Sequence, residues 1–554
     1  MAAPQKKRST QNAQSMAKKQ REISISEFFT KNRHLLGFDS PAKALLTTIK
    51  EAVDNSLDAC EEAGIPPRLF VEIRPDRPVN LGLELSSQED KPRGGSKNTG
   101  TKSASSKDDR FKLIIEDNGP GIVKAQIPKI FGKLLYGSKF HSLKQSRGQQ
   151  GIGISAAGMY GQLTTGQPVV IYSRTSPKAP AHRFVIKLDM KKNEPTILAG
   201  DETIWEKEHG TRIEITLTGS YKRGQHSVDN YLEQTAIANP HLHLTYKNPK
   251  GETAVHANAT QELPAEPREI RPHPYGVELG ILARMLSDTK SRNISSFMKD
   301  EFCRVGPKTC ELILQTAGIP PRRNPKRLIQ EDIQRLLEAI EGTKIPAPPT
   351  DCLSPIGEDL VMAGLKSGVE ADFYTSVTRP AAVYRGNPFQ IEVGIAYGGQ
   401  LPGDELAKVM RFANRVPLLY QASACAIHKA VLGAGWRNYG VTQSKGALPT
   451  APMVILIHMA SVWVPFTSES KEAVAHYPEI IKEMTLALQE AGRRLKRYLN
   501  RRAREKDALK KKSYIQKYIP HIGDALQEIL GIDETEREEV IAKLTDTLER
   551  SRKM

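Results

Sequence analysis

The stretch PAKALLTTIKEAVDNSLDACEEAG, residues 41–64, predicts one long amphipathic helix with its acidic residues gathered on one side. Ser40 is a favourable N-cap, Pro41 suits the first helical position, and Gly64, with two prolines close behind, ends the helix. At about 100° per residue the two faces separate. The apolar face holds Leu46, Ile49, Val53, Leu57 and Cys60, and the polar face holds Glu51, Asp54, Asn55 and Asp58. Such a polar face is most often only solvated, so the helix alone does not identify a site.

Two further segments point to a bound ligand. An apolar strand at 111–116 runs into DNGPG at 117–121, and a glycine-rich segment, RGQQGIGISAAG, occupies 147–158. Backbone N–H groups at a glycine-rich helix start can hold phosphates. The chain has no GxxxxGK[ST] pattern, which excludes a P-loop, and no βαβ unit surrounds Gly151 and Gly153, which argues against a dinucleotide fingerprint. The three pieces together predict a nucleotide site.

The residue types in these segments suit phosphate chemistry. Asn55 offers a side-chain oxygen to Mg²⁺, and Glu51, one turn away, is placed to accept a proton from an attacking water. Asp117 can accept a hydrogen bond from an exocyclic amine, while Gly119 and Gly121 let a planar base approach the backbone. We therefore expect these residues to meet around one nucleotide.

The whole chain is basic. Its 554 residues carry a net charge of +17, which favours a polyanionic partner, nucleic acid before membrane. Five scattered cysteines predict neither a disulfide framework nor a zinc site. The lysine-rich start is followed by no apolar segment of a signal peptide, so we expect a cytoplasmic protein.

The chain divides into five predicted regions. A disordered basic tail, 1–22, precedes an α+β domain at 23–265, in which a Gly/Ser/Lys-rich flexible insert occupies 75–109. In this domain we expect a short helix or strap at 23–36, strands at 68–73, 111–116, 168–173, 182–188 and 212–217, and helices at 124–135 and 152–162. The polar, glycine-bounded loop at 136–150 is a candidate lid.

The second half begins with a helical module at 266–349, predicted from helical patterns at 277–286, 294–302 and 307–317 and followed by a basic exit. A second α+β domain at 350–512 has predicted strands at 383–385, 390–397 and 454–459, helices at 404–414 and 421–432, and a long exit helix from 478. Residues 513–554 predict C-terminal helices, and Val540, Ile541, Leu544 and Leu548 form an expected docking face for a partner.

At the nucleotide-site residues the sequence resembles the GHKL ATPases. Glu51 and Asn55 match the N-box, 117–121 the G1 box, 148–155 the G2 box, and His209-Gly210-Thr211 the G3 element. The resemblance implies a Bergerat-type α/β sandwich that binds ATP and Mg²⁺, with Glu51 as general base, Asn55 as the metal ligand and Asp117 on adenine. The implied nucleotide-binding residues are Asn55, Asp117, Gly119, Gly121, Ser138, Lys139, Gly148, Gln149, Gln150, Gly151, Ile152, Gly153, Ile154, Ser155, Thr211 and Lys445.

The remaining regions resemble the B subunits of type IIB DNA topoisomerases. The module around 306–309 is similar to a helix-two-turns-helix domain, and RFANRVPL at 411–418, VTQSKGA at 441–447 and VPFTSESKEAV at 464–474 are similar to a transducer domain. This resemblance implies an ATP-hydrolysing subunit that dimerises on ATP and acts on double-stranded DNA. Cleavage then belongs to a separate A subunit in an A2B2 heterotetramer. It also implies that Lys445 reaches the γ-phosphate, with Gln443 beside it.

Other family members fit less well. Gyrase-type B subunits carry an acidic cleavage cluster, and no Asp-x-Asp occurs here. A mismatch-repair relative would lack the helical module, and a heat-shock chaperone would be acidic where this chain is basic. The alternative is a DNA-binding scaffold of repair or recombination with an inactive ATP site. The presence of Glu51, Asn55 and Asp117 argues against it.

Overall fold

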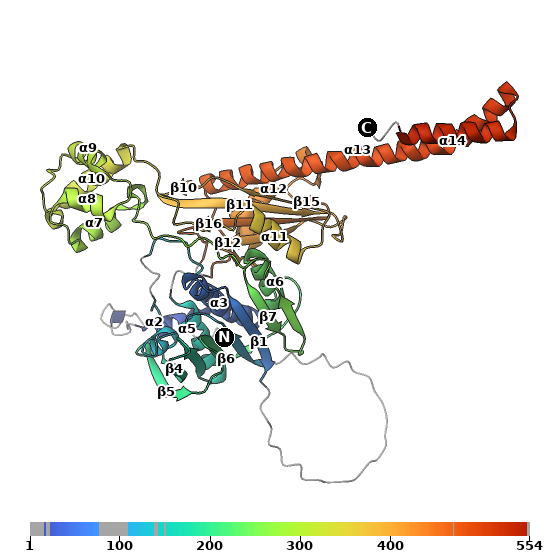
Figure 1. The fold of residues 1–554 in the computed structure, drawn as a ribbon. Coiled ribbons are helices and arrows are strands. Elements are labelled where there is room, and N and C mark those ends of the chain that lie inside the picture. The colour runs from blue at the N-terminus through green and yellow to red at the C-terminus, as the bar shows by residue number, and fades with distance from the viewer. Residues whose placement is uncertain are drawn as a thin grey trace, which may run out of the picture.

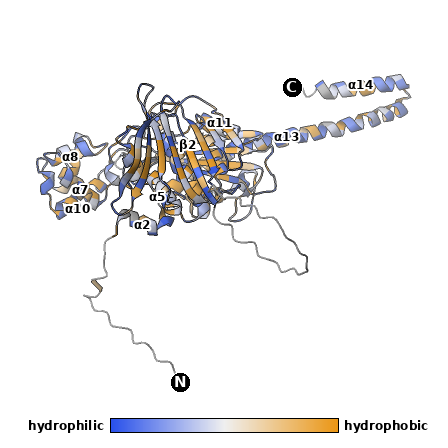
Figure 2. Cartoon of the chain, turned by 90° about the horizontal axis from the view of Figure 1, so that it is seen from below, coloured by the Kyte–Doolittle hydropathy of each residue, from blue (hydrophilic) through white to orange (hydrophobic). Residues whose placement is uncertain are grey.

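The computed structural model describes residues 16–17, 23–76, 109–137, 142–148, 151–468 and 470–550. Figure 1 shows a first domain of helices and strands, a small helical module to one side, and a second domain from which a long helix projects. In Figure 2 this projecting arm leaves the body as a pair of helices. Among the described residues, no helix combines the length and the apolar character needed to cross a membrane.

The first domain is built on an eight-stranded sheet in the order β5-β4-β3-β6-β2-β1-β7-β8. Neighbouring strands are antiparallel except β1 and β7, which run parallel. The strands are β1 (Arg68–Pro75), β2 (Asp109–Glu116), β3 (Val169–Arg174), β4 (Ala181–Asp189), β5 (Glu194–Thr203), β6 (Gly210–Gly219), β7 (His243–Lys247) and β8 (Thr253–His256). The helices are α2 (Ile25–Lys31), α3 (Pro41–Glu62), α4 (Ile127–Gly132), α5 (Gly153–Thr165) and α6 (Val228–Ala238).

The prediction for this domain was incomplete. It did not include β5, β7, β8 or α6, and α4 is shorter than the predicted helix at 124–135, because the chain is already extended at Lys133. The strap at 23–36 contains α2 and a 3₁₀ turn at Arg33–Leu36. Most of the tail and insert, residues 1–15, 18–22 and 77–108, lies outside the described residues.

Helix α3 forms as its sequence predicts, and it ends at Glu62, two residues before the predicted end. The Ser40 hydroxyl accepts a hydrogen bond from the Lys43 N–H, which is the expected N-cap. The whole predicted apolar face is buried. Asp54 and Asp58 are buried as well, so this polar face is not simply solvated. The helix therefore carries polar groups into the interior, where each needs a partner.

The helical module holds one helix more than predicted. Its elements are α7 (Leu279–Asp288), α8 (Ile294–Glu301), α9 (Pro307–Ala317) and α10 (Gln330–Gly342). Phe297 and Leu336 lie in its buried core, so α10 completes the module. The expected basic exit is part of this packing, because Arg323 forms an ion pair with Asp332 of α10 at 2.5 Å.

The second domain has a sheet in the order β10-β11-β16-β12-β13, with β9 also paired to β11. Its main elements are α11 (Glu358–Gly368), β9 (Phe373–Thr378), β10 (Ala382–Tyr384), β11 (Asn387–Tyr397), β12 (Lys408–Ala413), β13 (Val416–Pro417), α12 (Ala426–Gly433) and β16 (Met453–Ser461). The predicted helix at 404–414 is wrong: β12 lies there and pairs in parallel with β16. A parallel strand buried on both faces shows no alternation, so its pattern can be mistaken for a helix.

The arm consists of α13 (Pro478–Leu530) and α14 (Glu534–Arg550). The first turns of α13 pack on the second domain, with Ile480, Met484 and Leu488 fully buried. Helix α14 folds back along α13 in Figure 1, and Ile541 lies against Gly523. The expected docking face on α14 is therefore partly covered, and exposed apolar side chains lie instead on the outer half of α13, including Tyr514, Tyr518 and Ile529.

Candidate active site

A cavity of about 610 Å³, a size typical of ligand pockets, lies between α3, the loop after β2, α4 and the start of α5. It gathers the predicted general base, Glu51, and most of the predicted nucleotide-binding residues, namely Asn55, Asp117, Gly121, Gly148, Gly151, Ile152, Gly153, Ile154 and Thr211. Gly119 and Ser155 are not among the lining residues, and the Ser155 hydroxyl donates to the Ile152 carbonyl at 3.0 Å. Ser138, Lys139, Gln149 and Gln150 lie outside the described residues.

Glu51 lies beside the first turn of α5. A Cβ atom at position 153 would collide with the Glu51 carboxylate, so glycine at this position gives the carboxylate its room. Helix α5 starts at Gly153, and a helix N-terminus favours anions through its free N–H groups and dipole. Asn55, one turn further along α3, is exposed at the cavity wall. A phosphate held at the start of α5 would thus lie near a carboxylate and an amide.

Asp117, at the end of β2, is held by three hydrogen bonds. The Ser56 hydroxyl donates to Oδ2 at 2.8 Å, and the N–H groups of Gly119 and Thr211 donate to Oδ1 at 2.9 and 3.0 Å. Burial raises the pKa of Asp117 above its ordinary value, and these hydrogen bonds oppose that rise. The carboxylate is therefore a fixed acceptor at the cavity wall.

The turn after Asp117 depends on glycine. Gly121 has φ of 70°, and a Cβ atom there would collide with the Arg174 carbonyl. His209 supports the same turn, because its Nδ1 lies 2.9 Å from the Gly119 carbonyl oxygen. The backbone of the loop that follows the carboxylate is thus fixed at Gly119 and at Gly121.

Lys445 and Gln443, which we expect at the γ-phosphate, lie outside the cavity lining in this structure. Lys445 is exposed, and neither residue lines the cavity. The Gln443 side chain is held within its own domain, where it accepts from the Trp436 N–H and donates to the carbonyls of Leu432 and Ala447. The sequence of the Gln-Ser-Lys-Gly loop could not show how far these two side chains lie from the cavity, because the loop is distant from α3 in sequence.

Lys471 is the second-domain lysine that lines the cavity. Its ammonium group donates to the Arg147 carbonyl at 3.3 Å, and its backbone is left-handed, with φ of 52°. The neighbouring Glu472 is buried and forms an ion pair with Lys43 of α3, which docks this loop on the first domain. Lys471 lies within the transducer-like motif at 464–474, so the sequence signal was present although the lysine was not singled out.

Two further ionisable groups at the cavity, Lys50 and Asp54, were not predicted as site residues. Lys50 lines the cavity, and burial lowers its pKa. Burial raises the pKa of Asp54 to about 7, with Glu51 acting in the same direction and Lys50 against it. The Tyr231 hydroxyl donates to Asp54 Oδ1 at 3.0 Å. Two groups with shifted protonation equilibria therefore lie next to Glu51.

Comparisons with known proteins agree with this geometry. Residues 41–220 match the family described as histidine kinase-, DNA gyrase B-, and HSP90-like ATPase, and residues 348–511 match the topoisomerase VI B subunit transducer. The B subunit of type 2 DNA topoisomerase 6 from Methanosarcina mazei is 46% identical over 537 residues, which cover 97% of this chain and 82% of the relative. The protein of the same name from Archaeoglobus fulgidus is 45% identical over 530 residues, which cover 96% of this chain and 83% of the relative.

These matches confirm the predicted resemblance and the fold class: a GHKL ATPase domain, which binds ATP, is joined to a transducer domain. The similarity extends over nearly the whole chain and over most of each relative. The chain therefore belongs to the family of type 2 DNA topoisomerase 6 B subunits.

Proposed function

We propose that this chain uses ATP binding and hydrolysis to drive the passage of one DNA duplex through a double-strand break that a separate topoisomerase VI A subunit makes. The observation that supports it is one cavity lined by Glu51, Asn55 and Asp117 of the ATPase domain together with Lys471 of the transducer. A site shared by two domains can tie the state of the nucleotide to the angle between them.

Each residue has a definite task in this proposal. Glu51 accepts a proton from the attacking water, and Asp117 accepts a hydrogen bond from the adenine amine. The N–H groups from Gly148 to the start of α5 hold the phosphates. Lys471 pairs with the γ-phosphate, the task first expected of Lys445.

Asn55 is the proposed magnesium ligand. The oxygen donors of Asn55 and Glu51 at the cavity wall fit the ligand preference of Mg²⁺. When bound, Mg²⁺ neutralises charge on the phosphate oxygens.

We also propose that the domains of the chain meet at residues 265, 349 and 512.

DNA and the A subunit are the proposed partners. The α13 stretch at 501–511 is exposed and rich in arginine and lysine, so its contact with DNA would be through phosphates and would weaken with salt. The outer half of the α13–α14 arm, with its exposed Tyr514, Tyr518 and Ile529, is the proposed docking site for the A subunit. Two such pairs would form an A2B2 assembly, with the strap at 23–36 crossing between the two ATPase protomers when ATP is bound.

The test is relaxation of supercoiled DNA by the chain together with an A subunit, with ATP hydrolysis measured in the same tubes. Glu51→Ala should lower hydrolysis by about 10²- to 10⁴-fold while a fluorescent ATP analogue still binds. Glu62→Ala is the matched control, because Glu62 lies on the same helix, outside the cavity, and its ion pair with Lys144 is near the surface. DNA binding without any hydrolysis by the native chain would support the scaffold alternative instead.

A further inference from the structure

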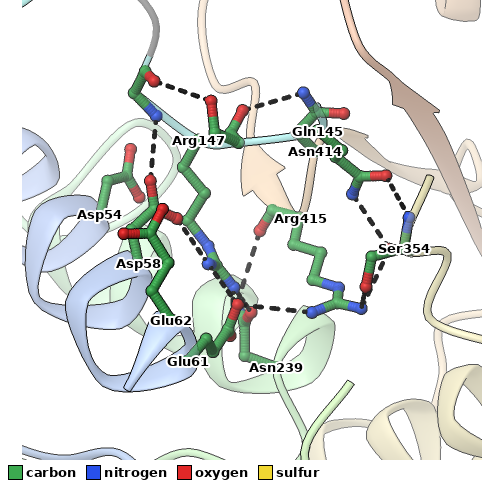
Figure 3. A network of polar contacts seen from close by, with 12 residues as sticks. Asp54, Asp58, Glu61, Glu62, Gln145, Arg147, Asn239, Ser354, Asn414 and Arg415 are labelled. Carbon is green, nitrogen blue, oxygen red and sulfur yellow. Dashed lines mark hydrogen bonds and ion pairs between the residues drawn. The ribbon is translucent and has the colours of Figure 1, made fainter. Parts of the chain in front are cut away.

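Two arginines from different domains meet at one carboxylate, as Figure 3 shows. Glu61, near the end of α3, receives Arg147 of the ATPase domain in a bidentate contact at 2.7 and 2.8 Å. Arg415 of the transducer approaches the same carboxylate to 3.7 Å. His241 Nε2 lies 2.7 Å from it. Burial alone would raise the pKa of Glu61, but Arg147, His241 and Arg415 hold it well below the ordinary value.

Arg147 anchors the start of the loop that precedes α5, called here the phosphate-binding loop, whose described residues are 145–148 and 151–152. Its side chain is only 4% exposed, and its guanidinium also donates to Asp58 Oδ1 at 2.8 Å and to Asn239 Oδ1 at 2.6 Å. The next residue, Gly148, donates its N–H to Asp58 and lines the cavity. A buried guanidinium that loses a partner is costly, so these contacts fix the position of the loop against α3.

Arg415 is held equally firmly by the transducer. It lies in the tight turn between β12 and β13, where Asn414 and Arg415 have φ of 47° and 66°. Its guanidinium donates to the Ser354 carbonyl at 3.0 Å and to the Pro355 carbonyl at 3.1 Å. Its backbone N–H donates to His458 Nε2, and His458 Nδ1 lies 2.7 Å from the fully buried Glu392. The Arg415 charge must therefore move with the transducer.

The same turn also touches the loop directly. Asn414 Nδ2 donates to the Ser146 carbonyl at 3.0 Å, one residue before Arg147. Gln145 exchanges hydrogen bonds with Ser354, so its side chain is tied to the segment that holds Arg415. Neither Asn414 nor Arg415 lines the nucleotide cavity. Any influence of the turn on nucleotide must pass through its contacts with the loop, with Glu61 and with Asn239, whose Nδ2 donates to the Arg415 carbonyl at 3.5 Å.

We propose that Arg415 is a positioning residue for ATP binding: through Glu61 it holds Arg147, and with it the phosphate-binding loop, in the geometry that accepts nucleotide. When the transducer rotates, Arg415 leaves Glu61, and the loop loses one of the charges that define its position. Nucleotide affinity then depends on the angle between the domains, and by linkage nucleotide favours one angle. This inference rests on the proposed nucleotide site but concerns residues that do not touch it.

The experiment measures the dissociation constant of a fluorescent, non-hydrolysable ATP analogue on the full chain. Arg415→Gln should raise it by about tenfold, as expected for a coupling between separate sites. Arg379→Gln is the matched control, because Arg379 pairs with Glu483 inside the transducer and should leave affinity within about twofold of the native chain. Arg147→Gln should also raise the constant by about tenfold, and the double variant should lose no more than about tenfold, because Arg415 acts on the loop through Arg147.

Several outcomes would overturn the inference. One is a folded Arg415→Gln variant that binds the ATP analogue with native affinity. Another is a double variant whose affinity falls by about a hundredfold, which is the product of the two single losses. If Arg415→Gln loses its native circular dichroism, Arg415→Lys replaces it. Lysine keeps the charge but cannot supply several fixed donors, so about a threefold loss of affinity is expected, and unchanged affinity would overturn the inference. Failure of the native chain and of Arg379→Gln to bind the analogue would instead refute the proposed nucleotide site.

Discussion

Asp54 offers a quantitative test of the electrostatics beneath the active site. Its pKa rises from the ordinary value of 3.8 to about 7, mainly through burial. Between these values the folded chain binds a proton that the unfolded chain has released, so the stability of the folded state falls as pH rises from about 4 to 7 and is level above. At 1.36 kcal/mol per pKa unit, the full cost at pH 8 is about 4 kcal/mol, and about 3 kcal/mol of it develops above pH 5.

Asp54→Asn should remove this cost. Asparagine keeps an oxygen that can accept from the Tyr231 hydroxyl, and it cannot ionise. We expect the variant to melt at a higher temperature than the native chain, with an advantage that is larger at pH 8 than at pH 5 by about 6 °C. Differential scanning fluorimetry of both proteins at the two pH values measures this difference.

Asp58→Asn is the control for this experiment. Asp58 is equally buried one turn along α3, but it forms an ion pair with Arg147 at 2.8 Å. Its replacement should therefore lower the melting temperature at both pH values. If the advantage of Asp54→Asn were the same at pH 5 and pH 8, the carboxyl group would not titrate in this range, and the reasoning from burial would be refuted.

Three further predictions concern the cavity and the arm. Lys471→Ala should lower ATP hydrolysis by at least about tenfold, because Lys471 lines the cavity. Lys445→Ala should leave hydrolysis within about twofold of the native rate, because Lys445 does not line the cavity, and equal losses of turnover in the two variants would contradict this assignment. Gly153→Ala should lower ATP hydrolysis by about tenfold or more, because its methyl group would displace the Glu51 carboxylate, and native turnover would show that the carboxylate has room to move. Replacement of Tyr514, Tyr518 and Ile529 by alanine should spare basal hydrolysis and abolish co-sedimentation with the A subunit, and continued co-sedimentation would place the docking site elsewhere.

The sequence predicted best where one local pattern determines the structure. Helix α3 has a capping serine, an N-terminal proline and a clear apolar stripe, and it lies within two residues of its predicted bounds. Strand β12 was misread because it is buried on both sides, so its residues do not alternate. Strand β5 is an edge strand with mostly exposed side chains, which leaves little apolar pattern to detect.

The residues of the cavity also differ in how well a local sequence pattern predicts them. Glu51, Asn55 and Asp117 belong to motifs whose spacing is local, and all three line one cavity. The partnership of Lys471 with Arg147 joins residues 324 positions apart, and that of Arg415 with Glu61 joins two domains. Contacts of this kind depend on how the domains pack, which no local pattern contains.

The projecting length of α13 has a mechanical consequence. An ion pair of Arg502 with Asp372 at 2.7 Å ties the middle of this helix to the transducer. Beyond it, residues 503–530 extend for about 42 Å at 1.5 Å per residue. A tilt of about 10° at its base, well within the range of domain rotations, would carry its tip through about 7 Å. A small rotation of the transducer can thus become a movement as wide as a side chain at the far end of the arm.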